Sequence, residues 1–297
     1  MQTKRHIEHL LTSAGVTPNK RLGQNFMIDL NLMRLLIGAA HIRHNDVILE
    51  VGCGTGSFTQ GLAEAAGEVI AVECDSKLAQ IAARQLKNAR NVTIINADIL
   101  KNKNTICHEV VAAVRQARAE FDGRCMLVAN LPYSVAASVM MNLIIAPPQP
   151  IAVDSMCVTV QKEVAERMVA RPGSENYGVL SIFMAAAGEP QIMRKLKPGV
   201  FWPQPQVQSM MVRFKRLPQK VDRIHNLPLF KEVVNLFMGH RRKMLQACTK
   251  FAAGRLERVS DWHDVFARAF VEPHRRGEEL TADEFISIAN ICNEQLQ

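Results

Sequence analysis

From Asp46 onward the chain alternates short, continuously apolar segments with segments whose apolar residues recur at helical spacing. A strand that is buried on both faces lacks an alternating pattern, because helices cover the sheet on either side. The pattern therefore predicts an α/β domain with a mostly parallel sheet. The predicted strands are VILEV (47–51), EVIAVE (68–73), VTIINAD (92–98), CMLVAN (125–130) and SMCVTVQ (155–161).

The pattern changes after the fifth predicted strand and the helix predicted for 162–170. The segments 179–187, 191–196 and 207–215 follow, and proline-rich turns rather than long helices separate the later ones. Strands that short turns connect are antiparallel neighbours. We therefore expect an antiparallel hairpin at one edge of the sheet.

Both ends of the chain carry helical patterns. Residues 1–20 predict a short basic amphipathic helix followed by a turn. Beyond Leu217 and Pro218 no further strand is predicted, and apolar residues recur at helical spacing. The predicted organisation is an N-terminal extension (1–20), a main α/β domain (21–217) and a small C-terminal all-helical domain (218–297).

The composition adds a constraint on partners and compartment. Thirty-six Lys and Arg against 28 Asp and Glu give a net charge of +8, which favours a polyanion such as nucleic acid or an anionic membrane surface. The seven cysteines are scattered singly, so neither a zinc site nor a disulfide framework is predicted. No signal peptide is visible, and the longest apolar stretch, 135–146, is too short to span a bilayer. We expect a cytoplasmic monomer without a metal or a membrane anchor.

A glycine-rich segment, LEVGCGTGSF, follows the first predicted strand and contains Gly52, Gly54 and Gly56. Glycine suits a turn whose backbone approaches a ligand closely or adopts a positive φ. The spacing is GxGxG, and Ser57 stands where the GxGxxG of dinucleotide folds has its last glycine. By itself the segment is compatible with a ligand-free tight turn.

Two acidic residues at later strand ends point to a ligand. Glu73 closes the second predicted strand, where a carboxylate can accept hydrogen bonds from both hydroxyls of a ribose. Asp98 closes the third, in a position to accept from the amino group of an adenine. A glycine turn and two strand-end acids without a pyrophosphate site predict S-adenosylmethionine as the cofactor. Glu50 has two open interpretations, namely hydrogen bonding to the amides of the loop or contact with the cofactor.

The fourth predicted strand ends in Asn130-Leu131-Pro132-Tyr133. Methylation of the amino group of adenine is difficult because the nitrogen lone pair is delocalised into the ring. Acceptors for both amino protons, the Asn130 side-chain oxygen and a backbone carbonyl at Leu131 or Pro132, favour a pyramidal nitrogen. Pro132 stiffens the turn, and Tyr133 can stack on the base. Elsewhere such a segment is more often a proline turn with a buried tyrosine, but here it stands where a substrate would bind.

The ordered set of segments resembles the ribosomal RNA adenine N6-dimethyltransferases, the kasugamycin-sensitivity family, over nearly the whole chain. Many ordered matches are more specific than any one of them. The matching segments are RLGQNFMID (21–29), LEVGCGTG (49–56), VECD (72–75), NADIL (96–100), NLPY (130–133), VQKEVAERM (160–168), PGSENYGVLS (172–181), FWPQPQVQS (201–209), HRRKML (240–245) and RRGEELTADEF (275–285).

The resemblance implies a Rossmann-like class I methyltransferase sheet followed by a helical RNA-binding domain. It implies that Asn25 and the backbone at Met27 contact the methionine part of the cofactor, and that Asn130 lies between the cofactor and the target amine. It also implies that Phe201 stacks on the target base opposite Tyr133. The remaining residues expected to bind the cofactor are Gly52, Gly54, Glu73 and Asp98.

Three positions depart from the usual pattern of the family. This chain has Gln208 where the family usually has Asp, Val179 where it has Arg, and Cys74 where it has a branched aliphatic residue. These departures concern the positioning of the substrate loop and the packing of the cofactor adenine. They leave the expected chemistry unchanged.

The leading hypothesis is dimethylation of two adjacent adenosines in the 3'-terminal hairpin loop of small-subunit rRNA, on a preribosomal particle. A large-subunit enzyme of the erythromycin-resistance type is the first alternative, and a non-catalytic RNA-binding assembly factor is the second. A nicotinamide oxidoreductase is disfavoured by the glycine spacing. The basic segments are His240–Lys243, Arg275–Arg276, Arg194–Lys197 and Arg213–Arg216, and we expect the helical domain to use several of them on RNA phosphates.

Overall fold

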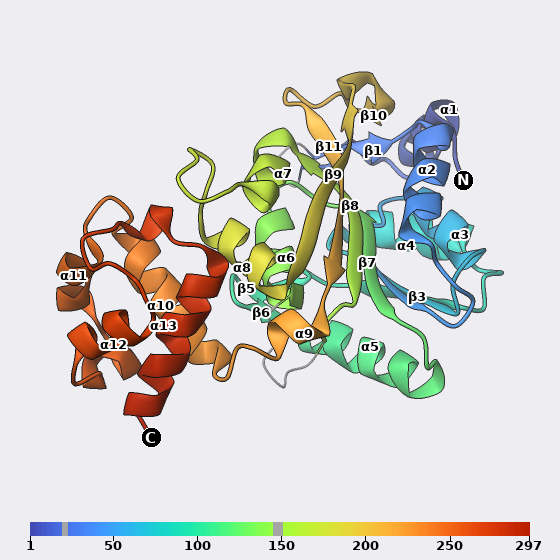
Figure 1. The fold of residues 1–297 in the computed structure, drawn as a ribbon. Helices are drawn as coiled ribbons and strands as arrows, with labels where there is room; N and C mark the ends of the chain where they lie inside the picture. Colours follow the sequence, from blue (N-terminus) through green and yellow to red (C-terminus); the bar gives the residue numbers. More distant parts are fainter. Residues whose placement is uncertain (20–22, 145–150) are drawn as a thin grey trace. The chain divides into compact units, whose positions relative to one another are not determined.

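A sheet of seven strands has the order β4-β3-β2-β7-β8-β11-β9 (Figure 1). The computed structural model of the chain describes residues 1–19, 23–144 and 151–297. Arg21 and Leu22 of the RLGQNFMID segment and residues 145–146 of the apolar stretch lie outside the described residues. The strands are β2 (Val47–Val51), β3 (Glu68–Glu73), β4 (Val92–Asn96), β7 (Cys125–Asn130), β8 (Ser155–Gln161), β9 (Gly188–Leu196) and β11 (Ser209–Arg216).

The strand directions confirm a mostly parallel sheet with an antiparallel edge. β2 is parallel to β3 and β7, β3 is parallel to β4, and β7 is parallel to β8. β11 is antiparallel to β8 from Ser209, opposite Gln161, to Lys215, opposite Ser155. β9 lies beyond β11 at the edge. The five strands predicted from apolar segments are all present, although β4 ends at Asn96, two residues earlier than predicted.

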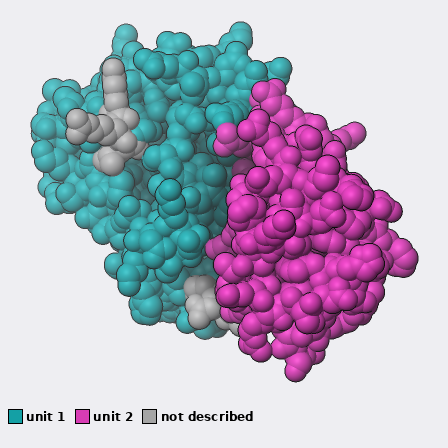
Figure 2. Space-filling model, turned by 90° about the vertical axis from the view of Figure 1, so that its left-hand side faces the viewer, with its two compact units in different colours: residues 1–165, 191–215 teal, residues 166–190, 216–297 magenta. Residues whose placement is uncertain are grey.

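Figure 2 shows the chain divided into two compact units, residues 1–165 with 191–215 and residues 166–190 with 216–297. The first unit contains the sheet apart from one end each of β9 and β11, and it has helices on both sides of the sheet (Figure 1). It also contains two short strand pairs, β1 (Phe26–Met27) with β10 (Phe201–Trp202) and β5 (Leu100–Asn102) with β6 (Thr105–Ile106). The helices of this unit are α1 (Lys4–Ser13), α2 (Leu30–Ala40), α3 (Ser57–Ala63), α4 (Ser76–Gln85), α5 (His108–Glu120) and α6 (Ala136–Ile144), and α7 (Lys162–Val169) crosses into the second unit.

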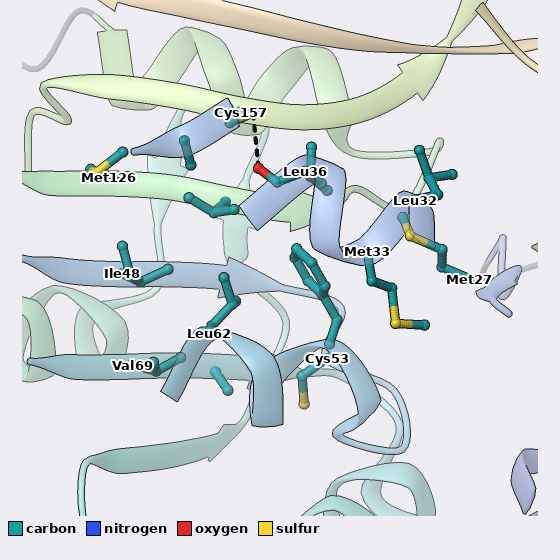
Figure 3. Packing of buried hydrophobic residues seen from close by; sticks show 14 of the residues in the cluster. Met27, Leu32, Met33, Leu36, Ile48, Cys53, Leu62, Val69, Met126 and Cys157 are labelled. Atoms are coloured by element: carbon teal, nitrogen blue, oxygen red, sulfur yellow. Dashed lines mark hydrogen bonds between the residues drawn. The ribbon is translucent and has the colours of Figure 1, made fainter. Parts of the chain in front are cut away.

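The core on one side of the sheet forms where α2 and α3 cover the strands. Ile48, Val69 and Met126 of three strands and Leu36 of α2 belong to one buried cluster (Figure 3). The Cys157 thiol donates to the Leu36 carbonyl at 3.5 Å, a contact that Figure 3 shows as a dashed line. Burial of each such side chain contributes roughly 1.5–3 kcal/mol, so the cluster holds α2 against the strand ends.

The predicted N-terminal helix is present as α1, and its role is structural. The Thr3 hydroxyl caps the helix by accepting from the His6 amide. Ile7 and Leu11 on its apolar face are buried against Leu78 and Ile81 of α4. Arg5, His6 and His9 of the helix are exposed.

The second unit is helical, and it includes residues 166–190, which the sequence pattern placed within the main domain at 21–217. The segment 179–187 forms helix α8, and its Phe183 packs edge-to-face on Phe230 of α10 at 5.1 Å between ring centroids. This aromatic contact groups α8 with the C-terminal helices. They are α8 (Val179–Ala187), α9 (Pro218–Val221), α10 (Leu227–Gly239), α11 (Leu245–Cys248), α12 (Trp262–Arg268) and α13 (Ala282–Gln295), with 3₁₀ turns at Thr249–Phe251, Gly254–Arg258 and Gly277–Glu279. Within the described parts of the chain, no helix is long and apolar enough to cross a membrane.

An ion pair between Asp46 and Arg124 joins the amino end of β2 to the amino end of β7. The Asp46 side chain is fully buried and accepts from the Arg43 amide at 2.8 Å and from the Arg124 amide at 2.8 Å. The Arg124 guanidinium also donates to both carboxylate oxygens. Burial works to raise the pKa of Asp46, but these hydrogen bonds and the Arg124 charge outweigh it and lower the pKa below its ordinary value.

We expect Asp46→Ala to lower the free energy of unfolding by about 2 kcal/mol, because it leaves the Arg43 and Arg124 amides without their acceptor and removes the buried partner of the half-buried Arg124 guanidinium. Urea unfolding at pH 7 measures the change. Asp122→Ala removes an exposed neighbouring carboxylate and should change stability by less than about 0.5 kcal/mol. Equal losses for the two variants would contradict the structural role of Asp46.

Candidate active site

One cavity lies at the carboxyl ends of β2, β3 and β7, beside the turn that follows β4. In a sheet of this order the crevice between β2 and β7 is the point where the connections change direction, and ligands of open α/β sheets bind there. Ten of the eleven residues predicted for the site line this cavity, and Phe201 does not. The ten are Asn25, Met27, Gly52, Gly54, Glu73, Asp98, Asn130, Leu131, Pro132 and Tyr133.

The glycine turn and the NLPY turn touch at a position where a side chain could not fit. Gly52 has φ +80°, and a Cβ atom there would lie 2.8 Å from Cγ of Pro132. Gly54 has φ +58°, and a Cβ atom there would lie 3.0 Å from the Phe26 ring. Glycine is therefore required at both positions for the backbone conformation and for close approach. The missing side chains bring the two predicted binding segments into one cavity.

Glu73 holds the glycine turn from the neighbouring strand. One oxygen of its carboxylate accepts from the Gly54 amide at 2.8 Å, and the other accepts from the Asp75 amide at 2.9 Å and from the Cys74 thiol at 3.7 Å. Burial raises the pKa of Glu73, and these hydrogen bonds act in the opposite direction. The oxygen that bonds to Gly54 has a second lone pair, so Glu73 can still accept a hydrogen bond from a ligand hydroxyl.

Glu50 contributes a second acid to the same wall. Its side chain is buried, and among the described residues no hydrogen-bond donor reaches its Oε2 oxygen. Burial raises the pKa of Glu50 to about 8, the nearby Thr59 hydroxyl works to lower it, and the Glu73 charge raises it further. The interpretation that Glu50 bonds to the loop amides finds no such contact among the described residues. Two buried acids around a cavity suit a cationic ligand, because a positive charge favours their ionised forms.

Asp98 and Cys74 form the outer rim. Asp98 is exposed, lies two residues beyond the end of β4 and accepts from the Leu100 amide at 2.9 Å through one oxygen. Its other oxygen is available to a ligand. Burial and the Glu73 charge raise the pKa of the Cys74 thiol to about 11, so this cavity residue is a neutral thiol at pH 7.

The Asn130 side chain is held at both ends. Its amide nitrogen donates to the Asn25 carbonyl at 2.8 Å, and its oxygen accepts from the Thr159 hydroxyl. A backbone carbonyl can only accept, so the contact with Asn25 fixes which end of the amide carries the oxygen. Asn130 thereby joins the NLPY turn to the segment that contains Asn25.

Tyr133 and Phe201, the two rings predicted to hold a base, have different surroundings. The Tyr133 hydroxyl lies 2.6 Å from the Ser209 hydroxyl of β11, which fixes the ring at the cavity. Phe201 is 2% exposed, pairs with Met27 in the short β1–β10 ladder and belongs to the buried cluster under α2. The phenylalanines that do line the cavity are Phe26 and Phe58, and the Phe26 side chain points away from that of Met27 because side chains alternate along a strand.

The N-terminal segment makes contacts with the cavity and its glycine turn that were not predicted from the sequence. Ile7 of α1 lines the cavity. Gln2 is 4% exposed, its amide nitrogen donates to the Thr55 carbonyl at 3.0 Å, and its carbonyl oxygen accepts from the Thr55 hydroxyl at 2.7 Å. The Gln2 backbone amide donates to the Ser57 hydroxyl at 2.7 Å. The N-terminal segment therefore braces the glycine turn from outside, a long-range contact that no local sequence signal announces.

The strand order and the cavity with its glycine turn, strand-end acid and NLPY turn define a Rossmann-like class I methyltransferase fold. The sequence profile of the ribosomal RNA adenine dimethylase family matches residues 15–294. The chain therefore belongs to the ribosomal RNA adenine dimethylase family, as the resemblance predicted, and it is an enzyme of that family. Membership of a methyltransferase family implies S-adenosylmethionine as the methyl donor.

Individual relatives agree with this assignment. The ribosomal RNA small subunit methyltransferase A of Caldanaerobacter subterraneus subsp. tengcongensis is 35% identical over 272 residues, which cover 91% of this chain and 96% of the relative. The protein of the same name from Alkaliphilus oremlandii is 37% identical over 273 residues, covering 92% and 91%.

Two solved structures share the fold. A dimethyladenosine transferase from Plasmodium falciparum superposes with a TM-score of 0.69 and 21% identity, over 90% of this chain and 97% of that one. The 23S rRNA methyltransferase ErmE has a TM-score of 0.61 and 20% identity, over 91% of this chain and 100% of that one. At these identities the likeness concerns the fold alone.

We expect Glu50→Gln to remove a pH-dependent cost to folding. Between an unfolded pKa near 4.5 and a folded pKa of about 8, the folded chain retains a proton that the unfolded chain has lost, so Glu50 makes the free energy of unfolding fall as the pH rises through this range. The Gln side chain does not titrate. The free energy of unfolding of the variant should therefore exceed that of the wild type by an amount that grows from pH 5 to pH 8.

Urea unfolding of both proteins at pH 5, 6.5, 8 and 9, without methyl donor, measures this difference. Titrating groups distant from Glu50 are common to the two proteins and cancel in the comparison, whereas Glu73, which is coupled to Glu50, contributes to the difference as well. Parallel curves across the range would show that Glu50 is ionised in the folded chain.

Proposed function

We propose that this chain transfers methyl groups from S-adenosylmethionine to the N6 amines of two adjacent adenosines in the 3'-terminal hairpin loop of small-subunit rRNA. The substrate in this proposal is a preribosomal particle. The observation that carries the proposal is the contact of the Gly52 turn with Pro132, which puts a nucleoside-binding wall and an adenine-binding turn in one cavity. The names of the relatives from Caldanaerobacter and Alkaliphilus favour the small subunit.

The donor binds between the glycine turn and the acidic wall. Glu73 accepts from the ribose hydroxyls, and the free oxygen of Asp98 accepts from the adenine amino group. Asn25 and the Met27 backbone, which line the cavity beside Asn130, hold the methionine part. The cationic donor fits a wall that contains Glu50 and Glu73, since neither acid is neutralised by a basic side chain among the described residues.

Asn130 acts on the target amine. The Thr159 hydroxyl occupies one lone pair of the Asn130 oxygen, which leaves the second lone pair for an amino proton of the adenine. The second acceptor is the Leu131 carbonyl, because the Pro132 carbonyl already accepts from the amides of Val135 and Ala136 at 3.2 and 3.1 Å. Bonding of both protons directs the nitrogen lone pair toward the sulfonium methyl group.

Positioning supplies much of the rate in this reaction. The nitrogen displaces the methyl group from sulfur in line, and no covalent intermediate on the enzyme is needed. Tyr133 stacks on the base, with its ring fixed through Ser209. Stacking contributes roughly 1–3 kcal/mol per base, which offsets an extrusion cost of a few kcal/mol. Phe201 can supply the opposite ring only if the β10 segment leaves its place in the buried cluster.

We expect Asn130→Ala to lower the rate of methyl transfer about 100-fold or more, as loss of one oriented hydrogen-bonding group does in other enzymes. Transfer of radiolabelled methyl groups to immature small subunits measures the rate. Asn142→Ala is the matched control, because Asn142 of α6 bonds only to backbone carbonyls away from the cavity. An Asn130→Ala variant as fast as the control would remove Asn130 from the mechanism.

Assays on separated subunits test the choice of RNA. We expect methyl transfer to immature small subunits and none to immature large subunits. Transfer to large subunits alone would favour the type of reaction suggested by the name of ErmE, and binding of RNA without transfer to either would favour an assembly factor.

Glu73→Gln tests the donor site independently of RNA. The variant keeps one acceptor oxygen but loses the charge and one backbone bond, so we expect the Kd for S-adenosylmethionine to rise about ten-fold or more. Calorimetric titration measures it. Glu68→Gln, on the same strand and outside the cavity, should leave the Kd unchanged.

A further inference from the structure

The phenylalanine side chain at position 270 contributes no buried contact to the described part of the folded chain. Phe270 follows α12, its φ is +55°, and its side chain is 93% exposed. The Phe270 amide donates to the Ala267 carbonyl at 3.1 Å, and the Val271 amide donates to the Phe266 carbonyl at 3.0 Å, which closes the helix. Glycine is the usual residue at such a left-handed helix end, because a Cβ atom is disfavoured there.

Other exposed apolar side chains lie on residues 240–251, a segment that hydrogen-bonds to the segment beginning at Phe270. Six large apolar side chains are exposed in the described part of the chain, and three of them are Met244, Phe251 and Phe270. The Leu245 amide donates to the Arg275 carbonyl at 2.8 Å, and the Gln246 amide donates to the Pro273 carbonyl at 3.1 Å. These bonds join the strip 240–251 to the strip 270–276, which begins with Phe270.

The Phe251 ring is arranged for stacking. It is 48% exposed, and the His240 ring stacks on it at 4.1 Å between centroids and 27° between planes. The Lys243 ammonium lies 5.7 Å from its centroid, within the range of a cation–π contact. Phe251 therefore combines an exposed aromatic surface with a neighbouring positive charge.

Four cations of the same two strips have no acidic partner among the described residues. Arg242, Lys243, Lys250 and Arg276 are exposed, and none of them forms an ion pair with a described carboxylate. Other arginines of the same strips are neutralised inside the unit, since Arg241 pairs with Glu278 and Arg275 pairs with Glu284. The four unpaired cations are therefore available to bind an external anion, whereas Arg241 and Arg275 stabilise the unit through their ion pairs.

We propose that these two strips form a stacking face for unpaired RNA bases, in which Phe270 and Phe251 each carry a base and the four free cations bind the flanking phosphates. The face comprises Phe251, Phe270, Arg242, Lys243, Lys250 and Arg276. Aromatic rings among cations are the common arrangement for single-stranded nucleic acid, because every base has a π surface and every linkage has a charge. A protein partner with an apolar patch would match the rings but would leave four cations without counter-charges. The proposal rests on the proposed function, in that the substrate is an RNA particle.

Phe270→Gly is the sharpest test, because it should improve the fold while it weakens binding. Glycine relieves the left-handed backbone, so the thermal midpoint should stay the same or rise. The Kd for immature small subunits and for a fluorescent single-stranded RNA should rise about ten-fold, as expected for the loss of one stacked base. Phe251→Ala should weaken RNA binding to a similar extent. Met193→Ala, which removes an exposed apolar side chain from β9 outside this face, is the matched control and should change neither Kd.

A charge variant tests the phosphate contacts. Arg242→Gln should weaken binding equally across RNA sequences and reduce the slope of log Kd against log salt by about one. The Kd for S-adenosylmethionine should remain that of the wild type in all of these variants, because no residue of the face lines the donor cavity.

Unchanged RNA affinity in both aromatic variants would overturn the proposal. Loss of affinity for the particle with unchanged affinity for free RNA would overturn it as well, because the rings would then contact a protein. Failure of the proposed function is a separate result. If the wild-type protein transfers no methyl groups to small subunits, the free-RNA arm of the test still decides whether the face stacks bases.

Discussion

The close approach of Gly52 to Pro132 is the constraint on which the rest of the site depends. The absence of a side chain at Gly52 lets the turn after β2 lie against the turn after β7. In the proposed reaction, the methyl donor and the target adenine must come within bonding distance. The turns after the adjacent parallel strands β2 and β7 touch, so ligands bound at these two turns lie next to each other. Glu73 then fixes the first turn, and Thr159 orients the amide of the second.

Electrostatics acts in the same direction as geometry. The site is acidic although the protein carries a net charge of +8, and the free cations of the helical unit lie on residues outside the donor cavity. Glu50 and Glu73 are buried at the donor side, where a positive ligand compensates for the cost of their burial. In the proposed function, one unit therefore binds a polyanion and a cavity of the other binds a small cation.

The strands and most of the cavity were predictable because both follow from local patterns. Continuous apolar runs mark strands covered on both faces, and strand ends in one sheet must converge, which correctly placed Glu73 and Asn130 in one cavity. The orientation of Phe201 was not predictable in this way, since it depends on a two-residue ladder with β1 that no periodicity marks. The contact of Gln2 with Thr55 and the grouping of α8 with α10 are long-range as well, and Phe270 stands out only once its backbone angle is known.

The brace formed by Gln2 bears on the order in which the molecule assembles. Gln2 and Thr55 are 53 residues apart in the chain, so Gln2 is synthesised before Thr55 exists. The nascent N-terminal segment must wait until the first strand and its glycine turn have emerged. The segment that contains Gln2 therefore reaches its final place only after the turn that it contacts has been made, and the wall of the cavity becomes complete at that stage.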